Sequence, residues 1–222
     1  MEDRKWKESK RKVKAVLLRL EKRYGVPRKK KQGDPLDTLI QTILSQNTND
    51  RNRDRAYERL KARYPDWENV LKARESAVVD ALRPGGLARQ KARRIREILR
   101  WARRHYGGWS LLPLEEKSSG EIEEALGGLK GIGPKTLHCF LLFGMGREAF
   151  PVDTHILRIG KRLGLIPEEM SAEEAHRRMA PLVPEKKSLS LHLNLIRFGR
   201  DICKARNPQC HACFLADKCV RR

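Results

Sequence analysis

The sequence predicts an all-α protein. Almost every segment repeats its apolar residues at helical spacing, and few segments alternate apolar and polar residues as a strand does. The loops between these segments are short and are marked by glycine or proline. Hydrophobic residues make up 39% of the 222 residues, and their periodic grouping argues against a disordered chain. This length allows one large domain or two small ones, each with a core.

The first three expected helices lie before Pro65. The first spans 5–24 and ends before Gly25, while Pro35 opens the second. The third, over 50–64, is basic and amphipathic. The apolar faces of the first two consist of Val13, Val16, Leu17 and Leu20, and of Leu36, Leu39, Ile40, Ile43 and Leu44.

A strongly basic helix is expected after two short helical segments, 67–72 and 75–82, and a turn at 83–86. The stretch 89–104 holds eight Arg or Lys residues and one acid, Glu97. We therefore expect an amphipathic helix over 88–104 with a buried apolar face and a basic outer face. Its apolar positions are Ala88, Ala92, Ile95, Ile98, Leu99 and Ala102.

The remaining segments also have helical spacing. Helices are expected over 121–126, 154–163, 171–181 and 189–200. A further helix, from Pro134 through Phe143, follows a glycine-rich turn, because proline is favoured in the first helical turn. A cysteine-rich tail follows the last of these helices.

The charge of the chain favours a nucleic-acid partner. It has 49 Lys and Arg against 28 Asp and Glu, a formal net charge of +21. Residues 1–34 alone hold 14 basic and 5 acidic side chains, a net of +9. A merely solvated surface predicts balanced signs, so a polyanion explains the excess better. A membrane surface is the rival partner, but the basic segments do not lie opposite exposed aromatic faces.

The sequence gives no sign of a membrane or secretory protein. It has no run of 18 apolar residues, and its first residues lack an apolar signal core. The early acids Glu2, Asp3 and Glu8 disfavour a mitochondrial transit peptide. We expect a soluble, intracellular protein of the cytoplasm or nucleoid, with no membrane partner.

Four of the five cysteines predict a metal centre. Cys203, Cys210, Cys213 and Cys219 lie within 17 residues. Disulfides suit a small secreted domain rather than this chain. Zinc is possible, although a zinc ribbon has two CxxC pairs and this tail has one. A [4Fe–4S] cluster also takes four thiolates, and the fifth cysteine, Cys139, has the spacing of a core residue.

A glycine-rich turn, at residues 129–136, predicts a helix-hairpin-helix. Gly131 and Gly133 permit a tight turn and close approach of the backbone to a ligand. The following helix would present free N–H groups to a DNA phosphate. The alternative is a plain corner between two helices.

Two polar residues near this turn are candidates for chemistry. Lys135, in the first turn of the following helix, is either a phosphate contact or a nucleophile, and the helix end and desolvation would favour its neutral amine. Asp153, eighteen residues later, precedes a helix that either it or Thr154 is expected to cap, and a capping role for Asp153 is compatible with a catalytic one. We expect His155 to be structural.

The hairpin, its lysine, the VDTH segment at 152–155 and the cysteine tail together resemble the endonuclease III family. These are helix-hairpin-helix DNA glycosylases with a [4Fe–4S] cluster, and the resemblance covers about 36–222. It implies two helical domains flanking a DNA-binding cleft. A six-helix barrel with the helix-hairpin-helix would span 35–147, and an iron–sulfur cluster domain would combine 1–34 with 148–222.

The resemblance also implies roles for individual residues. Lys135 matches the family's nucleophile and Asp153 its catalytic aspartate, while the four tail cysteines match the cluster ligands. Leu87 matches the apolar wedge that fills the space of a flipped base. Lys204 and Arg206 lie on the cysteine loop, where they could meet phosphates. The expected protein is a monomeric glycosylase and AP lyase that excises a damaged pyrimidine from double-stranded DNA with a damaged or mismatched base.

The loop after the second helix departs from the family pattern. Asn47 stands where the family's inserted glutamine is expected, unless Gln46 takes that role by a local shift. The pattern around these residues looks more like plant glycosylases that excise 5-methylcytosine. Alternatives are therefore a modified-cytosine glycosylase, a monofunctional enzyme acting on U or T opposite G, and a non-catalytic DNA-binding module.

Overall fold

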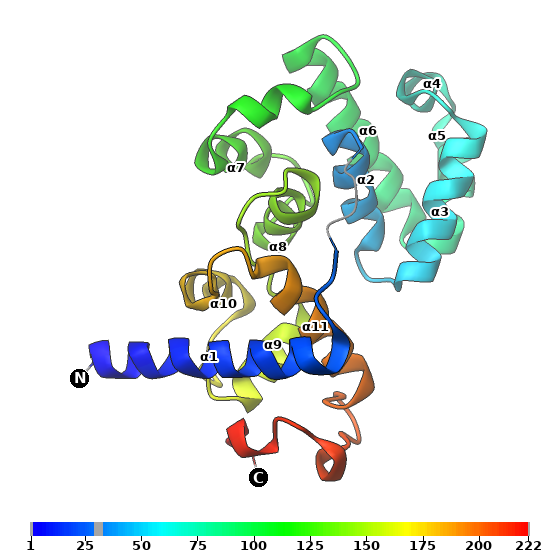
Figure 1. The fold of residues 1–222 in the computed structure, drawn as a ribbon. Helices are drawn as coiled ribbons and strands as arrows, with labels where there is room; N and C mark the ends of the chain where they lie inside the picture. The colour runs from blue at the N-terminus through cyan, green and yellow to red at the C-terminus, as the bar shows by residue number, and fades with distance from the viewer. Residues whose placement is uncertain (1, 29–32, 222) are drawn as a thin grey trace. The chain divides into compact units, whose positions relative to one another are not determined.

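The computed structural model describes residues 2–28 and 33–221, and within these ranges the chain forms helices and loops without strands (Figure 1). The prediction of an all-α fold is confirmed. Two compact units are formed. We call residues 33–147 the middle unit, and residues 2–28 with 148–221 the terminal unit.

The middle unit contains seven of the α-helices found in the described residues. Four of them lie in its first half, α6 follows, and α7 and α8 flank the glycine turn near its end. The helices are α2 (Pro35–Ser45), α3 (Asp50–Arg63), α4 (Trp67–Lys72), α5 (Glu75–Leu82), α6 (Ala88–Tyr106), α7 (Ser119–Gly127) and α8 (Pro134–Cys139).

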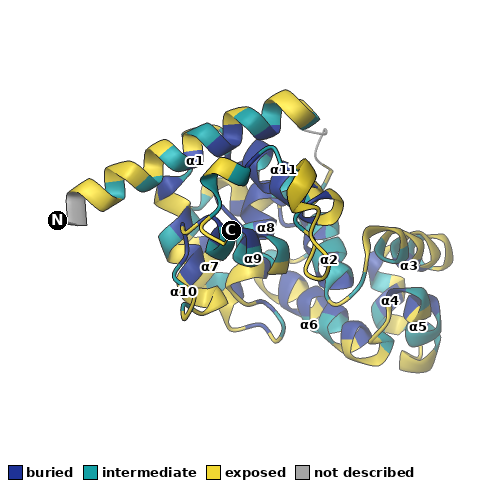
Figure 2. Ribbon diagram, turned by 90° about the horizontal axis from the view of Figure 1, so that it is seen from below, coloured by how far each residue is buried: buried dark blue, intermediate teal, exposed yellow. Residues whose placement is uncertain are grey.

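Helix α2 lies at the centre of the middle unit. It contacts α3, α6 and α8, and its apolar face is fully buried, as Figure 2 shows in dark blue. Its N-cap Asp34 accepts hydrogen bonds from the backbone N–H of Leu36 at 2.8 Å and of Leu111 at 3.1 Å. The same carboxylate therefore caps the start of α2 and holds a segment 77 residues away.

Helix α6 differs from the prediction at two of its basic positions. Lys91 is fully buried, and Arg96 donates hydrogen bonds to the carbonyls of Val70, Leu71 and Ala73 at 2.8–3.0 Å. These two side chains face inward, so the helix does not present all of its basic residues on an outer face. Each binds backbone carbonyls that a helix end would otherwise leave without a donor.

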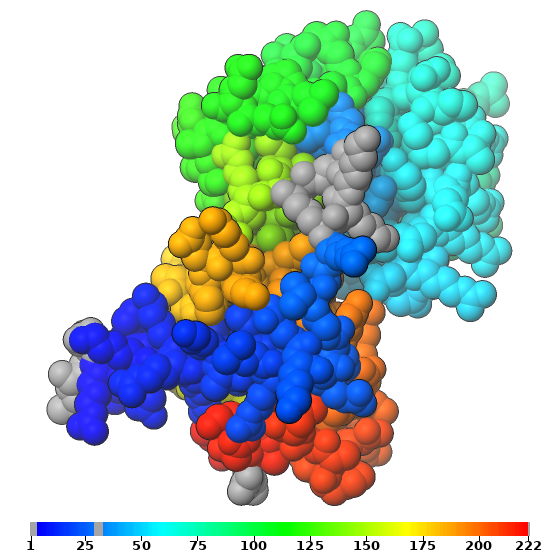
Figure 3. Space-filling model, viewed as in Figure 1, coloured from blue at the N-terminus to red at the C-terminus, as the bar shows by residue number. Residues whose placement is uncertain are grey.

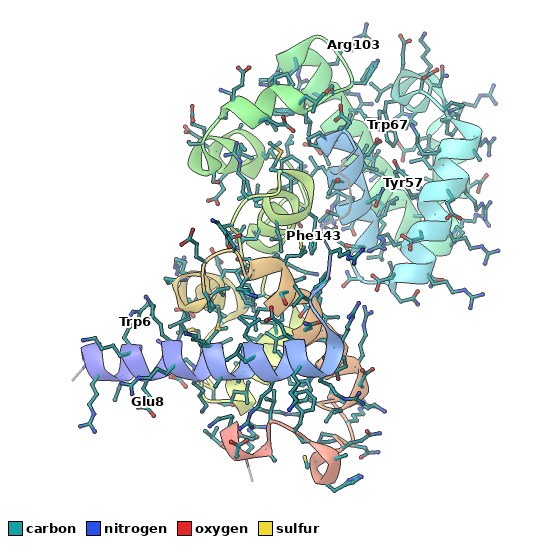
Figure 4. The ribbon with its side chains drawn as sticks, viewed as in Figure 1. Trp6, Glu8, Tyr57, Trp67, Arg103 and Phe143 are labelled. Carbon is teal, nitrogen blue, oxygen red and sulfur yellow. The ribbon has the colours of Figure 1, made fainter. Side chains whose placement is uncertain are left out.

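At the α3–α4 corner, long polar side chains cover the core of the middle unit. Tyr57 and Trp67 lie 6.4 Å apart between ring centroids, and both are labelled in Figure 4. Lys61 lies over the Trp67 ring at 4.3 Å, a cation–π contact, and the indole N–H donates to Asp37 at 3.1 Å.

The terminal unit joins the two ends of the chain. Its helices are α1 (Glu2–Tyr24), α9 (Thr154–Arg162), α10 (Ala172–Met179) and α11 (Ser188–Asp201), with α11 packed on both α1 and α9. Arg19 on α1 forms an ion pair with Asp217 and donates to the carbonyl of Phe214 at 3.1 Å. Figure 3 shows the C-terminal tail, in red, lying against the blue N-terminal helix.

Three segments differ from the sequence predictions. The helix expected through Phe143 is α-helical only to Cys139 and continues as a π-helix over Phe140–Gly144. A 3₁₀ helix at Leu112–Glu116 had no periodic signal. Helix α7 begins earlier than expected, because Ser118 and Glu121 form a reciprocal capping box.

Candidate functional site

The glycine hairpin lies between α7 and α8. Gly131 has a φ of +87°, and a Cβ added there would come within 2.5 Å of Nε of Arg94. Gly133 caps α8 with extended backbone, and a Cβ there would meet nothing within 4 Å. The backbone therefore favours glycine at residue 131, where an added Cβ would also displace the flexible Arg94 side chain, whereas Gly133 leaves open space beside the start of α8.

Lys135 lies on the first turn of α8 and is exposed. Within the described residues its amine has no hydrogen-bond or ion-pair partner. The side chain lies in solvent, so the described residues of the middle unit do not supply the desolvation that would favour a neutral amine. Desolvation of the amine would have to come from a bound substrate.

Asp153 is the N-cap of α9, as predicted, and is half-buried. Its Oδ1 accepts a hydrogen bond from the backbone N–H of Ile156 at 2.8 Å. The preceding residues are held in place, because the N–H of Val152 donates to His176 and the carbonyl of Pro151 lies 2.9 Å from Nδ1 of His192. A cap uses one carboxylate oxygen, so the same side chain can also act on a ligand.

His155 has a structural environment, as expected. It is half-buried beside Gly199, and its Nδ1 lies 3.1 Å from the guanidinium of Arg158. Burial lowers the pKa of His155, which favours the neutral ring that an arginine neighbour requires.

The loop after α2 places the neighbouring residues Gln46 and Asn47 in different surroundings. The Gln46 amide donates to the carbonyl of Gly131 at 2.9 Å and to the hydroxyl of Thr136 at 3.2 Å, and its oxygen accepts from Arg94 at 2.6 Å. Asn47 is exposed, with a left-handed φ of +51°. The side chain of Gln46 is thus engaged within the middle unit, and Asn47 is the residue displayed at the loop tip.

Leu87 lies at a second tip, in the turn before α6. It is 50% exposed and has a left-handed φ of +47° directly after Gly86, whose φ is +68°. Exposure of a large apolar side chain on a strained backbone costs free energy in the isolated protein. Such a combination is typical of a side chain positioned for a ligand.

Two arginines of α9 hold the start of the cysteine loop. Arg158 donates to the carbonyl of Cys203 at 2.9 and 3.1 Å and to that of Gly199 at 3.1 Å. Arg162 donates to Sγ of Cys203 at 3.2 Å and to the carbonyl of Lys204 at 2.8 Å. Lys204 itself is exposed, as is Arg206 farther along the loop.

The four tail thiols form one electrostatic group. Burial raises the pKa of Cys213, and its Coulombic interaction with Cys203, Cys210 and Cys219 raises it further. In the described part of the chain, no three His, Cys, Asp or Glu side chains form a ready metal site, so the thiols interact without converging on one point. Four thiolates in one segment match the donor set of an iron–sulfur cluster, and the Arg162 guanidinium would offset their negative charge.

Comparison with known proteins identifies the family. The model of the HhH-GPD superfamily of base excision DNA repair proteins matches residues 40–185, and that of the iron–sulfur binding domain of endonuclease III matches residues 203–219. The chain belongs to this superfamily. Endonuclease III of Thermotoga maritima is 37% identical over 193 residues, which cover 87% of this chain and 86% of that protein.

Two further relatives extend the comparison. A putative DNA glycosylase of Arabidopsis thaliana is 37% identical over 168 residues, 76% of this chain and 57% of that protein. The structure of a non-covalent endonuclease III–DNA complex has a TM-score of 0.81 and 26% identity, covering 95% of each chain.

This member of the superfamily is therefore a DNA-binding base excision glycosylase of the endonuclease III type, a group with DNA N-glycosylase and AP lyase activity. Its cofactor is a [4Fe–4S] cluster, which the four-thiol donor set fits. No helix in the described residues is long and apolar enough to cross a membrane.

Lys91 was expected among the basic residues on the outer face of α6, and the structure buries it. Its Nζ donates to the carbonyls of Leu44 and Gly85, each at 2.7 Å. Burial lowers the pKa of Lys91 to about 8, and the charge of Arg94 adds to this effect. A signal was present, because residue 91 precedes Ile95 by one helical turn and shares its inward face.

Proposed function

We propose that this glycosylase excises a damaged pyrimidine from duplex DNA and then cleaves the strand through a Schiff base on Lys135. The observation that carries this proposal is the exposed Lys135 amine, without a partner in the described residues, on the first turn after the hairpin. A phosphate-binding lysine needs only its charge, whereas a nucleophile must also be able to lose a proton and reach carbon.

The chemistry follows from the two side chains. The target base must leave the stack before any protein group can reach the sugar. Departure of the base builds positive charge on the sugar, which the Asp153 carboxylate would stabilise. The neutral Lys135 amine forms a bond to C1′ as the bond to the base breaks, and loss of a proton from nitrogen with ring opening gives the Schiff base. Removal of a C2′ proton then expels the 3′ phosphate.

DNA contacts are proposed for both loop tips and for the hairpin. Leu87 would fill the space of the flipped base, and Asn47 would meet the opposite strand, since Gln46 is held by the hairpin. The backbone at Gly131 and Gly133 would approach a phosphate. Exposed Lys204 and Arg206 would contact phosphates through the cysteine loop.

The cluster would have a structural role in this proposal. Cys203, Cys210, Cys213 and Cys219 would hold it, and when bound it would fix the fold of the loop that carries Lys204. We retain the barrel at 35–147 and the cluster domain at 1–34 with 148–222 as proposed boundaries. We further propose an intracellular monomer, which light scattering with and without DNA would test.

Borohydride trapping tests the proposal. Labelled duplexes would carry thymine glycol, dihydrouracil, U·G, T·G, 5-methylcytosine, 8-oxoguanine or an abasic site, with Lys135→Ala and Asp153→Asn beside the wild type. An adduct that requires Lys135, strongest with an oxidised or reduced pyrimidine, is expected. Base release without an adduct would indicate a monofunctional enzyme, and binding with neither would overturn the proposal.

A modified-cytosine glycosylase is the second candidate. The Gln46–Asn47 pattern favours it, because it looks like that of plant glycosylases that excise 5-methylcytosine. The same experiment separates the two candidates, because a 5-methylcytosine adduct stronger than the thymine glycol adduct would select the second.

A further inference from the structure

A single buried ammonium group joins the two loop tips of the middle unit. Lys91 has no exposed surface, and its Nζ lies 2.7 Å from the carbonyl oxygen of Leu44 and 2.7 Å from that of Gly85. These carbonyls are 41 residues apart in the sequence. Because a buried ammonium requires acceptors, each carbonyl is held firmly at hydrogen-bond distance from the same nitrogen.

Each of these carbonyls lies two or three residues before an exposed residue at a loop tip. Leu44 precedes Asn47 by three residues, and Gly85 precedes Leu87 by two. Both tip residues are exposed and have left-handed φ angles, +51° and +47°. A non-glycine residue keeps such a backbone only where its surroundings hold it there. The Lys91 hydrogen bonds supply a fixed point for both tips.

Arg94, less than one turn further along α6, extends the connection to the hairpin. It donates to the oxygen of Gln46 at 2.6 Å, and the amide nitrogen of Gln46 donates to the Gly131 carbonyl at 2.9 Å. The first turns of α6 therefore bind the loop after α2, the turn before α6 and the hairpin. All of these contacts lie within one compact unit.

We propose that Lys91 is a positioning residue that fixes the spacing between the Asn47 and Leu87 tips, so that both enter the duplex together when the base is flipped. This inference rests on the proposed function of the two tips. Insertion into stacked DNA is opposed by the unstacking free energy, so tips already held at the correct spacing lose less entropy on binding than tips that move separately.

The test uses Lys91→Met, which preserves length and removes the donors. Arg96→Met is the matched control, because Arg96 is also a cation of α6 that binds backbone carbonyls, but at α4 and not at either tip. Binding is read first without chemistry, on a duplex with 2-aminopurine opposite a tetrahydrofuran site. Wild type and Arg96→Met should raise the 2-aminopurine fluorescence by displacing this base, and Lys91→Met should not.

Rates give the second readout. Excision of a paired lesion by Lys91→Met should fall about 10- to 100-fold, the range expected for a displacement of about 1 Å in a positioned group. Trapping of a preformed abasic site should fall less than about threefold, since no base remains to be flipped. In a Leu87→Ala background the Lys91→Met change should have little further effect, because the second tip whose spacing Lys91 would fix has already been removed.

Three outcomes would overturn the inference: a fluorescence rise with Lys91→Met equal to that with wild type, equal losses in Lys91→Met and Arg96→Met, or full additivity with Leu87→Ala. If Lys91→Met does not fold, Lys91→Gln, which keeps an uncharged donor, should show an intermediate loss, and a wild-type response there would equally contradict us. A wild-type fluorescence response without base release on any duplex would refute the proposed function but leave this inference standing.

Discussion

Asp153 has two proposed roles that substitution can separate. Its Oδ1 caps α9 through the Ile156 N–H at 2.8 Å, and its charge is proposed to stabilise the developing positive sugar. An asparagine keeps an oxygen acceptor at the same position and loses the charge. An alanine loses both. The pair Asp153→Asn and Asp153→Ala therefore distinguishes the cap from the chemistry.

The stability change can be estimated from the structure. Loss of an N-cap acceptor costs about 0.5–2 kcal/mol. Ile156 is fully buried in the core of the terminal unit, so a value of about 1–2 kcal/mol is expected for Asp153→Ala. For a chain of this length that lowers Tm by about 2–8 °C. Asp153→Asn should lower it by about 1–2 °C, because only the charge–dipole contribution of a few tenths of a kcal/mol is lost.

Activity should follow a different order. Both variants should lose about 10²- to 10³-fold in the single-turnover rate of base release, the range for removal of one electrostatic stabiliser. Circular dichroism melts and quenched-flow excision on the best duplex measure the two effects separately. Equal melting of the asparagine and alanine variants would refute the cap assignment, and wild-type excision by Asp153→Asn would refute the catalytic one.

Four further predictions follow from the structure. Lys135→Met should lose the trapped adduct but keep the wild-type Tm, because the exposed amine has no partner in the described residues. Gly131→Ala should destabilise the protein by about 1–2 kcal/mol through its left-handed backbone, while Gly133→Ala, in open space, serves as its control in thermal melts. Arg162→Met should weaken cluster retention about 10- to 100-fold, because it removes the hydrogen bond to Sγ of Cys203. Iron content and visible absorbance during chelator challenge measure the retention. A variant that retains the cluster as well as the wild type does would contradict the role of this contact. Burial lowers the pKa of Lys91 from its ordinary value of 10.5 to about 8 in the folded chain. Between these pH values the unfolded chain binds more protons than the folded chain, so the free energy of unfolding rises with pH. Lys91→Met should remove this rise in urea titrations, and an equal rise with pH in the wild type and the variant would disprove it.

Local patterns predicted most of the helices. The apolar spacing of 88–104 and the proline at residue 134 each marked a helix that the structure contains, and of the two expected caps of α9, Asp153 or Thr154, the structure has Asp153. These features depend on residues within one or two turns of each other, which the sequence displays directly. The change to a π-helix after Cys139 had no such local signal.

Functional side chains were less predictable than helices. Gln46 and Asn47 are neighbours of similar chemistry, and only the contact of Gln46 with Gly131, 85 residues away, distinguishes them. Whether Lys135 is exposed depends on which segments fold beside it. Neither fact follows from residue type or spacing.

The sequence by itself determined the all-α class, the cysteine donor set and the hairpin with its lysine, because helical periodicity, ligand spacing and turn glycines are properties of short segments. Only the tertiary structure decided that Lys91 is buried between two loops and that Arg94 and Gln46 connect one of them to the hairpin. The physical reason is that a buried cation is stable only where distant carbonyls converge on it, and that convergence exists only in the folded chain.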